Sequence, residues 1–270
     1  MVDLAGDWIL LERGGQRILQ CRPLLALSWL RHGFSLRTDT AGKIQNMALH
    51  AGDDRQDAPA RRGAFLAALG LEPDALVAAQ QVHGTRVAVV GPAARGAGAA
   101  DYAAALPETD GLATTEPGLP LSVYYADCAP LLLAEPGVRA VAAVHAGWRG
   151  AVSGIAARAV ETMAVSFGAD PARILAAVGP CIGPCCYRVG PEVIAAVPEK
   201  ARGLVVREAV DSLYLDLPGL NAWYLLAAGV PASGIFRSGE CTGCHPDLYH
   251  SHRRHGPGAG RMMAAIARVN

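Results

Sequence analysis

The middle of the chain constrains the fold most, because it is a series of apolar segments divided only by turns. Residues 121–125 and 130–134 predict strands on either side of Ala126-Asp127-Cys128. After a Pro136-Gly137 turn, residues 138–144 predict a further, buried strand. Hairpin-like neighbours of this kind pair antiparallel. The sequence therefore indicates an α+β fold and not a doubly wound parallel sheet.

Helical segments alternate with strands elsewhere in the chain. A helix is predicted from about residue 57 to residue 69, where Gly70 ends it, and another follows Gly147-Trp148-Arg149-Gly150 through about residue 167. The other predictions are a broken strand at 77–90, a surface loop at 93–105, a strand at 174–178, helices at 191–197 and 220–228, and a short helix at 262–269. No linker divides the chain, so we expect one domain over residues 1–270.

The charge balance limits the classes of partner. The 24 Lys and Arg residues equal the 24 Asp and Glu residues, so no basic excess favours nucleic acid or an anionic membrane. No apolar run reaches the ~18 residues of a membrane span. The start, Met1-Val2-Asp3-Leu4, lacks the basic and apolar regions of a secretory signal, which predicts a cytoplasmic protein. In that compartment the 7 cysteines are expected to be thiols, ligands or nucleophiles before disulfides.

Three potential metal ligands stand where predicted strands run out into loops: His83, Cys128 and His145. Zinc binds imidazole nitrogen and thiolate sulfur, and three protein ligands leave a fourth position for water or substrate. The separations of 45 and 17 residues match no compact zinc finger, although catalytic sites are often assembled from distant strand ends. Each residue also has an ordinary interpretation: His83 capping a turn, Cys128 as buried filler, and His145 as a core histidine.

The surrounding motifs resemble those of the YfiH/YlmD, or laccase-domain, family. The matches run in order from about Arg31 to Arg261. They are Gln81-Val82-His83-Gly84, Ala126-Asp127-Cys128, Val144-His145-Ala146-Gly147-Trp148-Arg149-Gly150, the segment from Gly179 to Tyr187, and the tail around Cys241 and Ser251-His252-Arg253-Arg254.

The resemblance implies a zinc site made by His83, Cys128 and His145. It also implies a four-layer α/β/β/α fold, similar to the catalytic domain of cytotoxic necrotizing factor toxins. The implied activity is that of a purine nucleoside phosphorylase, a pentosyltransferase that uses a purine nucleoside and phosphate. Adenosine deaminase and methylthioadenosine phosphorylase activities are implied as well.

Further residues are candidates for the site. With Cys128 held as a metal ligand, Asp127 and Asp110 are candidates for orienting ligands or transferring protons, although Asp127 is equally typical of a turn. Arg149 at a helix start suits phosphate or a nucleoside hydroxyl, and its alternative is a solvated cap. Arg253 precedes a Gly-rich turn, and either it or the adjacent arginine is expected to face solvent. The weaker candidates for substrate contact are Asn46 and His50, in a segment that departs from the family pattern.

Other site chemistries rank lower. The spacing Cys241-x-x-Cys244 suits a zinc ribbon, but the partner segment, with Cys181, Cys185 and Cys186, is irregular. A multicopper oxidase needs several His-x-His pairs, and the chain has one, His250-Ser251-His252. Zinc nucleobase deaminases carry a His-x-Glu motif that is absent here.

Two further functions compete for the same residues. A Cys128–His145 pair could act as a nucleophile on amides, as the toxin-like fold suggests. Alternatively, the chain is a non-enzymatic protein with a structural zinc ion. Metal content separates the first from the zinc enzyme, because a zinc-bound thiolate is a poor free nucleophile.

Overall fold

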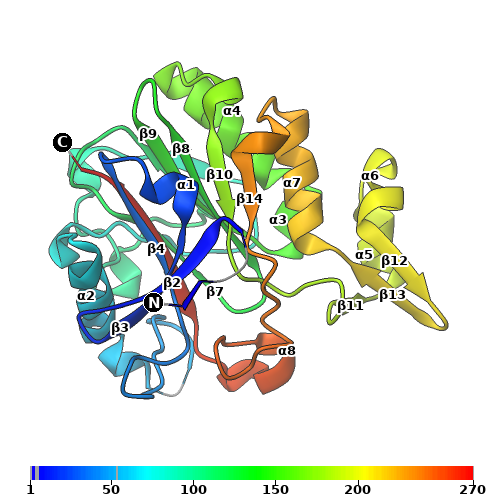
Figure 1. The fold of residues 1–270 in the computed structure, drawn as a ribbon, viewed down its shortest axis with the longest axis horizontal. Helices are drawn as coiled ribbons and strands as arrows, with labels where there is room; N and C mark the ends of the chain where they lie inside the picture. Colours follow the sequence, from blue (N-terminus) through cyan, green and yellow to red (C-terminus); the bar gives the residue numbers. More distant parts are fainter. Residues whose placement is uncertain (1, 4–5, 53, 270) are drawn as a thin grey trace.

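The computed structural model describes residues 2–3, 6–52 and 54–269, and its strands form two large sheets that pack face to face (Figure 1). The first sheet has the order β1-β2-β3-β4-β15-β7 and is antiparallel. Its strands are β1 (Val2–Asp3), β2 (Trp8–Arg13), β3 (Gln16–Cys21), β4 (Leu30–Ser35), β15 (Met262–Arg268) and β7 (Leu121–Tyr125).

The second sheet has the order β14-β10-β8-β9-β6-β5. Its strands are β14 (Ile235–Arg237), β10 (Leu175–Val178), β8 (Ala129–Glu135), β9 (Ala140–Ala146), β6 (Gly111–Thr114) and β5 (Val87–Val89). The inner strands pair antiparallel, as the hairpin at residues 129–146 predicted, and the edge strands β14 and β5 pair parallel with their neighbours.

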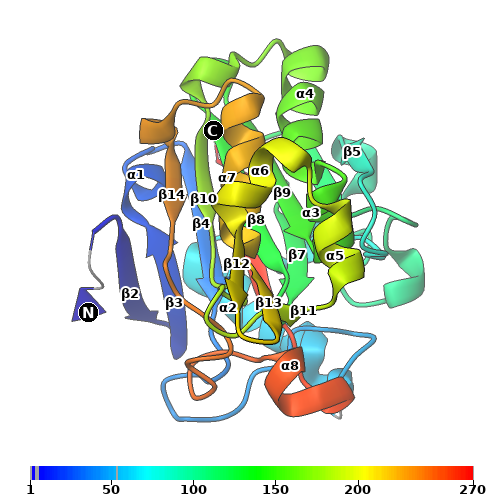
Figure 2. The same ribbon diagram turned by 90° about the vertical axis from the view of Figure 1, so that its right-hand side faces the viewer.

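Helices cover the outer faces of both sheets and form a projection on one side. The α-helices are α1 (Arg22–Leu25), α2 (Ala58–Leu69), α3 (Trp148–Val152), α4 (Ile155–Phe167), α5 (Pro191–Ala196), α6 (Glu199–Val205), α7 (Leu217–Ala227) and α8 (His252–His255). Single 3₁₀ turns are η1 (Arg55–Asp57), η2 (Pro73–Ala75), η3 (Pro92–Ala94), η4 (Tyr102–Ala104), η5 (Pro171–Arg173), η6 (Ala232–Gly234) and η7 (Gly256–Gly258). A small sheet, β11 (Arg188–Val189), β13 (Ser212–Leu215) and β12 (Val206–Ala209), projects with α5 and α6 at the right of Figure 1 and faces the viewer in Figure 2.

The side chains of each sheet alternate between two buried layers. In β8, Leu131 and Leu133 face the helices α4 and α7, whereas Leu132 faces the other sheet. In β15, Ile266 faces the second sheet and Met263 faces α2. The result is three apolar layers between four layers of secondary structure, helix, sheet, sheet and helix, as the resemblance implied.

The helix ends follow local chemistry. Helix α2 starts with a proline in its first turn and ends at Gly70, whose φ of 74° is left-handed. The N–H groups of Gly70 and Leu71 donate to the carbonyls of Ala67 and Leu66, which satisfies the end of the helix. The predicted helix at residues 57–69 is therefore confirmed to within one residue.

The C-terminal segment differs from the sequence prediction. Residues 262–269 were expected to form a short helix, but they form the strand β15, between β4 and β7. Met262–Ala267 are buried on both faces of the sheet, so the segment shows no alternation of apolar and polar residues. A short alanine-rich run of this kind is compatible with a buried strand or a helix, and the pairing partners decide between them.

Two other predicted elements are shorter in the structure than the sequence indicated. Of the predicted strand at 77–90, only β5 forms a regular strand. Val77 and Ala79 make isolated bridges to Leu121 and Leu106. The predicted helix after Gly147 is divided into α3 and α4 by Gly154, whose φ is 80°. Within the described residues, no helix is long and apolar enough to cross a membrane.

Two buried histidines predict acid sensitivity. Burial lowers the pKa of His32 to about 3 and that of His250 to about 4, from an unfolded value near 6.5. Because the folded protein binds fewer protons, the stabilisation is full above about pH 6.5 and is lost as the pH falls towards 4. Each histidine should cost roughly 2 kcal/mol of unfolding free energy between pH 7.5 and pH 5.

Urea unfolding at pH 7.5 and pH 5 measures this loss. His32→Gln should reduce the drop in unfolding free energy between the two pH values by roughly 2 kcal/mol, the contribution of that one histidine. The matched change at the exposed His245 should leave the drop as in the unmodified protein. An unchanged drop in His32→Gln would contradict the assignment to His32.

Candidate metal centre and its pocket

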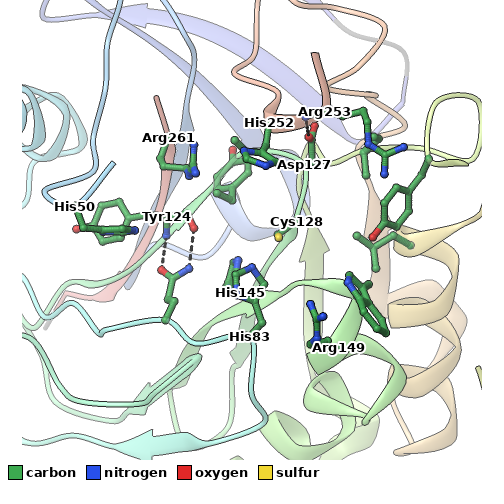
Figure 3. Close-up of a pocket in the computed structure, with 17 residues that line it drawn as sticks. His50, His83, Tyr124, Asp127, Cys128, His145, Arg149, His252, Arg253 and Arg261 are labelled. Atoms are coloured by element: carbon green, nitrogen blue, oxygen red, sulfur yellow. Dashed lines mark hydrogen bonds between the residues drawn. The ribbon is translucent and has the colours of Figure 1, made fainter. Parts of the chain in front are cut away.

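The three predicted metal ligands meet in the structure. His83 lies in the turn before β5, Cys128 lies between β7 and β8, and His145 lies near the end of β9. Their ligand atoms are all within 4.8 Å of one another, so the trio could hold a metal ion. Figure 3 shows the three side chains converging, and the two imidazole rings meet edge to face with centroids 4.9 Å apart.

Strand register explains why the sulfur meets the second histidine. In the β8–β9 hairpin Pro130 pairs with His145 and Ala129 pairs with Ala146. Cys128 directly precedes this ladder and is therefore carried to the end of β9 where His145 stands. The separation of 17 residues in sequence is the length of a strand, a turn and a returning strand.

Asp110 holds both histidines in place. Its Oδ1 lies 2.9 Å from Nδ1 of His145 and accepts a bond of 2.9 Å from the backbone N–H of His83. Its Oδ2 accepts from the N–H groups of Val82 and Gly84, at 3.1 Å and 2.8 Å. The carboxylate is fully desolvated, and one side chain thus fixes the ring of one ligand and the backbone of the other.

Strained and close-packed backbone surrounds the ligands. His83 and Asp127 have φ values of 61° and 82°, a region that costs non-glycine residues free energy and recurs at functional sites. A Cβ at Gly147 would lie 2.4 Å from Cδ2 of His83 and 3.2 Å from Sγ of Cys128. Only glycine fits at that position, which explains the glycine in the His145–Arg149 motif.

The charges of the trio favour metal binding. Although burial opposes the charged form, the neighbouring His145 and His83 lower the pKa of Cys128 to about 6. Burial likewise opposes the imidazolium of His145, but Cys128 and Asp110 raise the pKa of that histidine to about 9. Cys128 is thus a thiolate near neutral pH, the form that binds a metal, and a metal ion bound there would displace the proton that His145 carries.

The trio lies at a cavity of about 370 Å³. Of the other predicted site residues, His50, Asp127, Arg149 and Arg253 line the same cavity. Arg149 stacks on Trp148 at 4.3 Å, and Arg253 lies over Tyr187 at 5.3 Å. The structure therefore brings two cationic side chains to the cavity from distant segments (Figure 3).

Asp127 is tied to two C-terminal segments. Its Oδ1 accepts a 2.6 Å hydrogen bond from Oγ1 of Thr242, and its Oδ2 accepts a 2.7 Å bond from the N–H of Arg253. The N–H of Ile182 donates to its carbonyl at 2.9 Å. Both carboxylate oxygens of Asp127 are therefore engaged in hydrogen bonds within the protein.

Asn46 does not line the cavity. Its amide donates to the carbonyl of Ala51 at 2.7 Å, and its Oδ1 accepts from the N–H groups of Ala48 and Arg261, each at 3.0 Å. Asn46 thereby holds Arg261, whose side chain does line the cavity. His50, by contrast, reaches the cavity and packs on Tyr102 with ring centroids 4.7 Å apart.

Several lining residues were not singled out from the sequence. They are Gln81, Tyr124, Tyr125, Trp148, Ile182, Tyr187, Leu217, His252 and Arg261. Gln81 and His252 stand inside the quoted motifs, next to residues that were chosen, so position within a motif was the available signal. Gln81 bridges to β7, since its amide donates to the carbonyl of Tyr124 at 2.7 Å and accepts from its N–H at 2.8 Å. Arg261 had no such signal, because its segment was expected to lead into a helix.

The chain is similar to known proteins in sequence and in fold. A family model described as multi-copper polyphenol oxidoreductase laccase matches residues 31–269. The chain is 42% identical over 229 residues to purine nucleoside phosphorylase YlmD of Geobacillus stearothermophilus, covering 83% of both chains. It is 37% identical over 227 residues to adenosine deaminase RL5 of an unknown prokaryotic organism, covering 83% of this chain and 86% of that one. The crystal structure of YlmD from Geobacillus stearothermophilus matches with a TM-score of 0.87 at 36% identity, over 100% of this chain and 98% of that chain.

Proposed function

We propose that this chain, which belongs to the multi-copper polyphenol oxidoreductase laccase family, is a zinc-dependent purine nucleoside phosphorylase. Adenosine deaminase and methylthioadenosine phosphorylase activities at the same site are part of the proposal, and the whole chain acts as one domain. The relatives named purine nucleoside phosphorylase and adenosine deaminase support a nucleoside-processing enzyme. Membership also confirms the resemblance to YfiH and YlmD proteins that the motifs predicted.

The observation that carries the proposal is the position of the metal-binding trio at a cavity with cationic walls. His83, Cys128 and His145 offer two imidazole nitrogens and one thiolate, the donor set that suits zinc with an open position. Zinc held there would supply Lewis-acid polarisation of a reacting oxygen. Arg149 and Arg253 line the same cavity and suit an anionic oxygen such as that of phosphate.

The chain's own residues have the following proposed roles. In phosphorolysis an oxygen of hydrogen phosphate bonds to the anomeric carbon of the ribose while the bond to the purine nitrogen breaks, and the proton of the hydrogen phosphate passes to the leaving purine. The phosphate must therefore be aligned beside the sugar. Arg149 and Arg253 hold the phosphate in this alignment. His50 contacts the nucleoside, whereas Asn46 acts on it through Arg261.

The two aspartates position other groups. Asp110 fixes the orientation of the histidine ligands, and Asp127 fixes Arg253 and the strand end at Cys128. In deamination, water adds to C6 of adenosine and ammonia leaves, which gives inosine. The same cavity would present that carbon to the open position at the trio.

The side chains that could hold a metal do not match the copper centre that the family's description names. Among residues 2–3, 6–52 and 54–269, the groups that could hold a metal are the trio and one cluster of cysteines. Several histidine pairs would be needed for a multicopper centre. In the one His-x-His motif, His250 is buried, with its Nε2 donating to the carbonyl of Gln45 at 2.9 Å.

A second candidate function is amide hydrolysis by Cys128 and His145. The observation in its favour is the contact between this cysteine and a histidine that is itself oriented by Asp110 through a 2.9 Å hydrogen bond. The same geometry serves a metal ligand set. Zinc bound at the trio in the active protein decides between them, because the nucleophilic pair works only without the metal.

Product analysis tests the proposal. Zinc-loaded protein is incubated with adenosine, inosine or methylthioadenosine, with and without phosphate, and products are separated by chromatography. We expect free purine base only when phosphate is present, and inosine from adenosine in both conditions. Folded, zinc-loaded protein that yields neither product would contradict the purine assignment and move amide hydrolysis to first place.

A further inference from the structure

Two loops beside the pocket bring four cysteines together. One loop follows β10 and carries Cys185 and Cys186, and the other follows β14 and carries Cys241 and Cys244. Strands β10 and β14 are parallel neighbours, so their loops leave the same edge of the sheet. An isolated bridge between Cys181 and Cys241 keeps the loops paired beyond the strands.

The four sulfur atoms have the spacing of a metal site. All lie within 4.8 Å of one another. Sγ of Cys244 is 3.4 Å from that of Cys185 and 3.5 Å from that of Cys186. In a tetrahedral site with Zn–S distances of about 2.3 Å, the sulfur atoms are roughly 3.8 Å apart. We propose that these cysteines form a second metal site, distinct from the trio, that binds one Zn²⁺ through four thiolates.

The local backbone is shaped around the sulfurs. In Cys241-Thr242-Gly243-Cys244 the N–H groups of Cys244 and His245 donate to the carbonyl of Cys241 at 3.1 Å and 3.2 Å, which closes a tight turn. The N–H of Gly183 donates to Sγ of Cys241 at 3.2 Å. A Cβ at Gly243 would lie 3.1 Å from Sγ of Cys186, so this glycine leaves room for the opposing sulfur.

Nearby arginines suit the charge of such a site. Zinc with four thiolates carries a net charge of −2. Arg207 donates to the carbonyl of Pro184 at 3.1 Å, and Arg254 donates to the carbonyl of Gly243 at 2.7 Å. Each guanidinium is therefore anchored to one of the two cysteine loops, where it offsets the negative charge.

A disulfide is the competing arrangement. Cys244 lies at nearly the same distance from two sulfurs, Cys185 and Cys186, whereas a disulfide would join it to one of them. Cys241 would have no part in that bond, yet it belongs to the same cluster. Convergence of all four thiols favours a shared ion.

The second zinc would fix one wall of the pocket. Ile182 and Tyr187, which line the cavity, flank the first cysteine loop. Thr242, in the second loop, donates to Asp127, next to Cys128. An ion that joins the two loops thus holds the segments that position Asp127, without touching the substrate.

Metal counting tests the proposal independently of turnover. Purified protein from zinc-supplemented cells is dialysed, and zinc per chain is measured by elemental analysis. We expect two zinc ions in the unmodified protein, one in Cys128→Ala and one in Cys244→Ser. The matched control is Cys181→Ala, a buried cysteine in the same loop but outside the cluster, which should keep two.

A second variant controls for misfolding, and a thiol count tests for a disulfide. The double variant Cys185→Ser/Cys186→Ser removes the ligands of the other loop and should also retain one zinc, with an unchanged circular dichroism spectrum. Unfolded, metal-free protein should show all 7 thiols by reaction with a chromogenic disulfide. A zinc content that is the same in Cys244→Ser as in the unmodified protein, iron instead of zinc, or 5 reactive thiols (7 less one disulfide) would each overturn the second site. These readouts hold whether or not the protein acts on purine nucleosides.

Discussion

Cys128→Ala is expected to lose the metal at His83 and His145 and to lower turnover by about 10³-fold or more, while the protein stays folded. Removing one of three protein ligands leaves two imidazoles, too few for a stable catalytic site. Electrophilic assistance from a metal is worth several kcal/mol in the transition state, and each 1.36 kcal/mol is a factor of ten in rate. The fold should survive, because Cys128 is a half-buried residue between two complete strands and the change to alanine removes only its sulfur.

Zinc content, circular dichroism and phosphate-dependent cleavage of inosine are measured on the same preparation. Cys21→Ala is the matched control, since Cys21 is fully buried in the core between the sheets and away from the pocket. It should lose some stability and keep its activity. A Cys128→Ala protein that unfolds outright would favour a structural zinc and a non-enzymatic protein. A folded variant that loses activity while its zinc content equals that of the unmodified protein would make Cys128 a nucleophile.

The convergence of His83, Cys128 and His145 was predictable because each residue belongs to a short, contiguous motif at the end of a strand. The hairpin at residues 129–146 is local in sequence, so its register follows from the turn at residues 136–137. Its register alone brings Cys128 to His145. The motif glycines follow as well, because Gly147 leaves the space that His83 occupies.

The rest of the site depends on contacts between distant segments. Strand β15 was mistaken for a helix because its residues are buried on both faces by partners far away in sequence. Arg261 directly precedes β15, so the pairing of β15 with β4 and β7 is what brings this arginine to the pocket. The positioning of Arg261 by Asn46 joins residues separated by 215 positions, and no local pattern records that hydrogen bond.

The cysteine cluster illustrates the same limit. The spacing Cys241-x-x-Cys244 was visible in the sequence, but the opposing pair, Cys185 and Cys186, has no regular ligand spacing. The parallel pairing of β10 with β14 brings the two loops together, and neither strand shows its partner in its own sequence. The sequence could therefore suggest half of the site, while the topology supplies the other half.

Asp110→Asn is expected to weaken zinc binding at the trio about 10- to 100-fold, the usual cost of losing a group that orients metal ligands. Oδ1 of Asp110 serves His145 and the N–H of His83, and Oδ2 accepts from the N–H groups of Val82 and Gly84. An asparagine has one acceptor oxygen. In either orientation its NH₂ group would face N–H donors, so the turn that holds His83 in its left-handed conformation loses its partner.

Competition with a chromophoric chelator measures the zinc dissociation constant of the trio, with Cys244→Ser present in every protein compared so that the cysteine cluster does not contribute. The thermal midpoint with and without zinc shows whether the fold is kept. Asp101→Asn is the matched control, because Asp101 also accepts a backbone N–H, from Ala103 at 2.9 Å, but in an exposed turn away from the trio. Its zinc affinity should equal that of the unmodified protein. The zinc affinity of Asp110→Asn should fall, and a lower thermal midpoint of the zinc-free protein should accompany this fall, because backbone N–H groups lose an acceptor that is buried. Equal zinc affinities in Asp110→Asn and the unmodified protein would show that strand geometry alone orients the ligands and that Asp110 has no part in it.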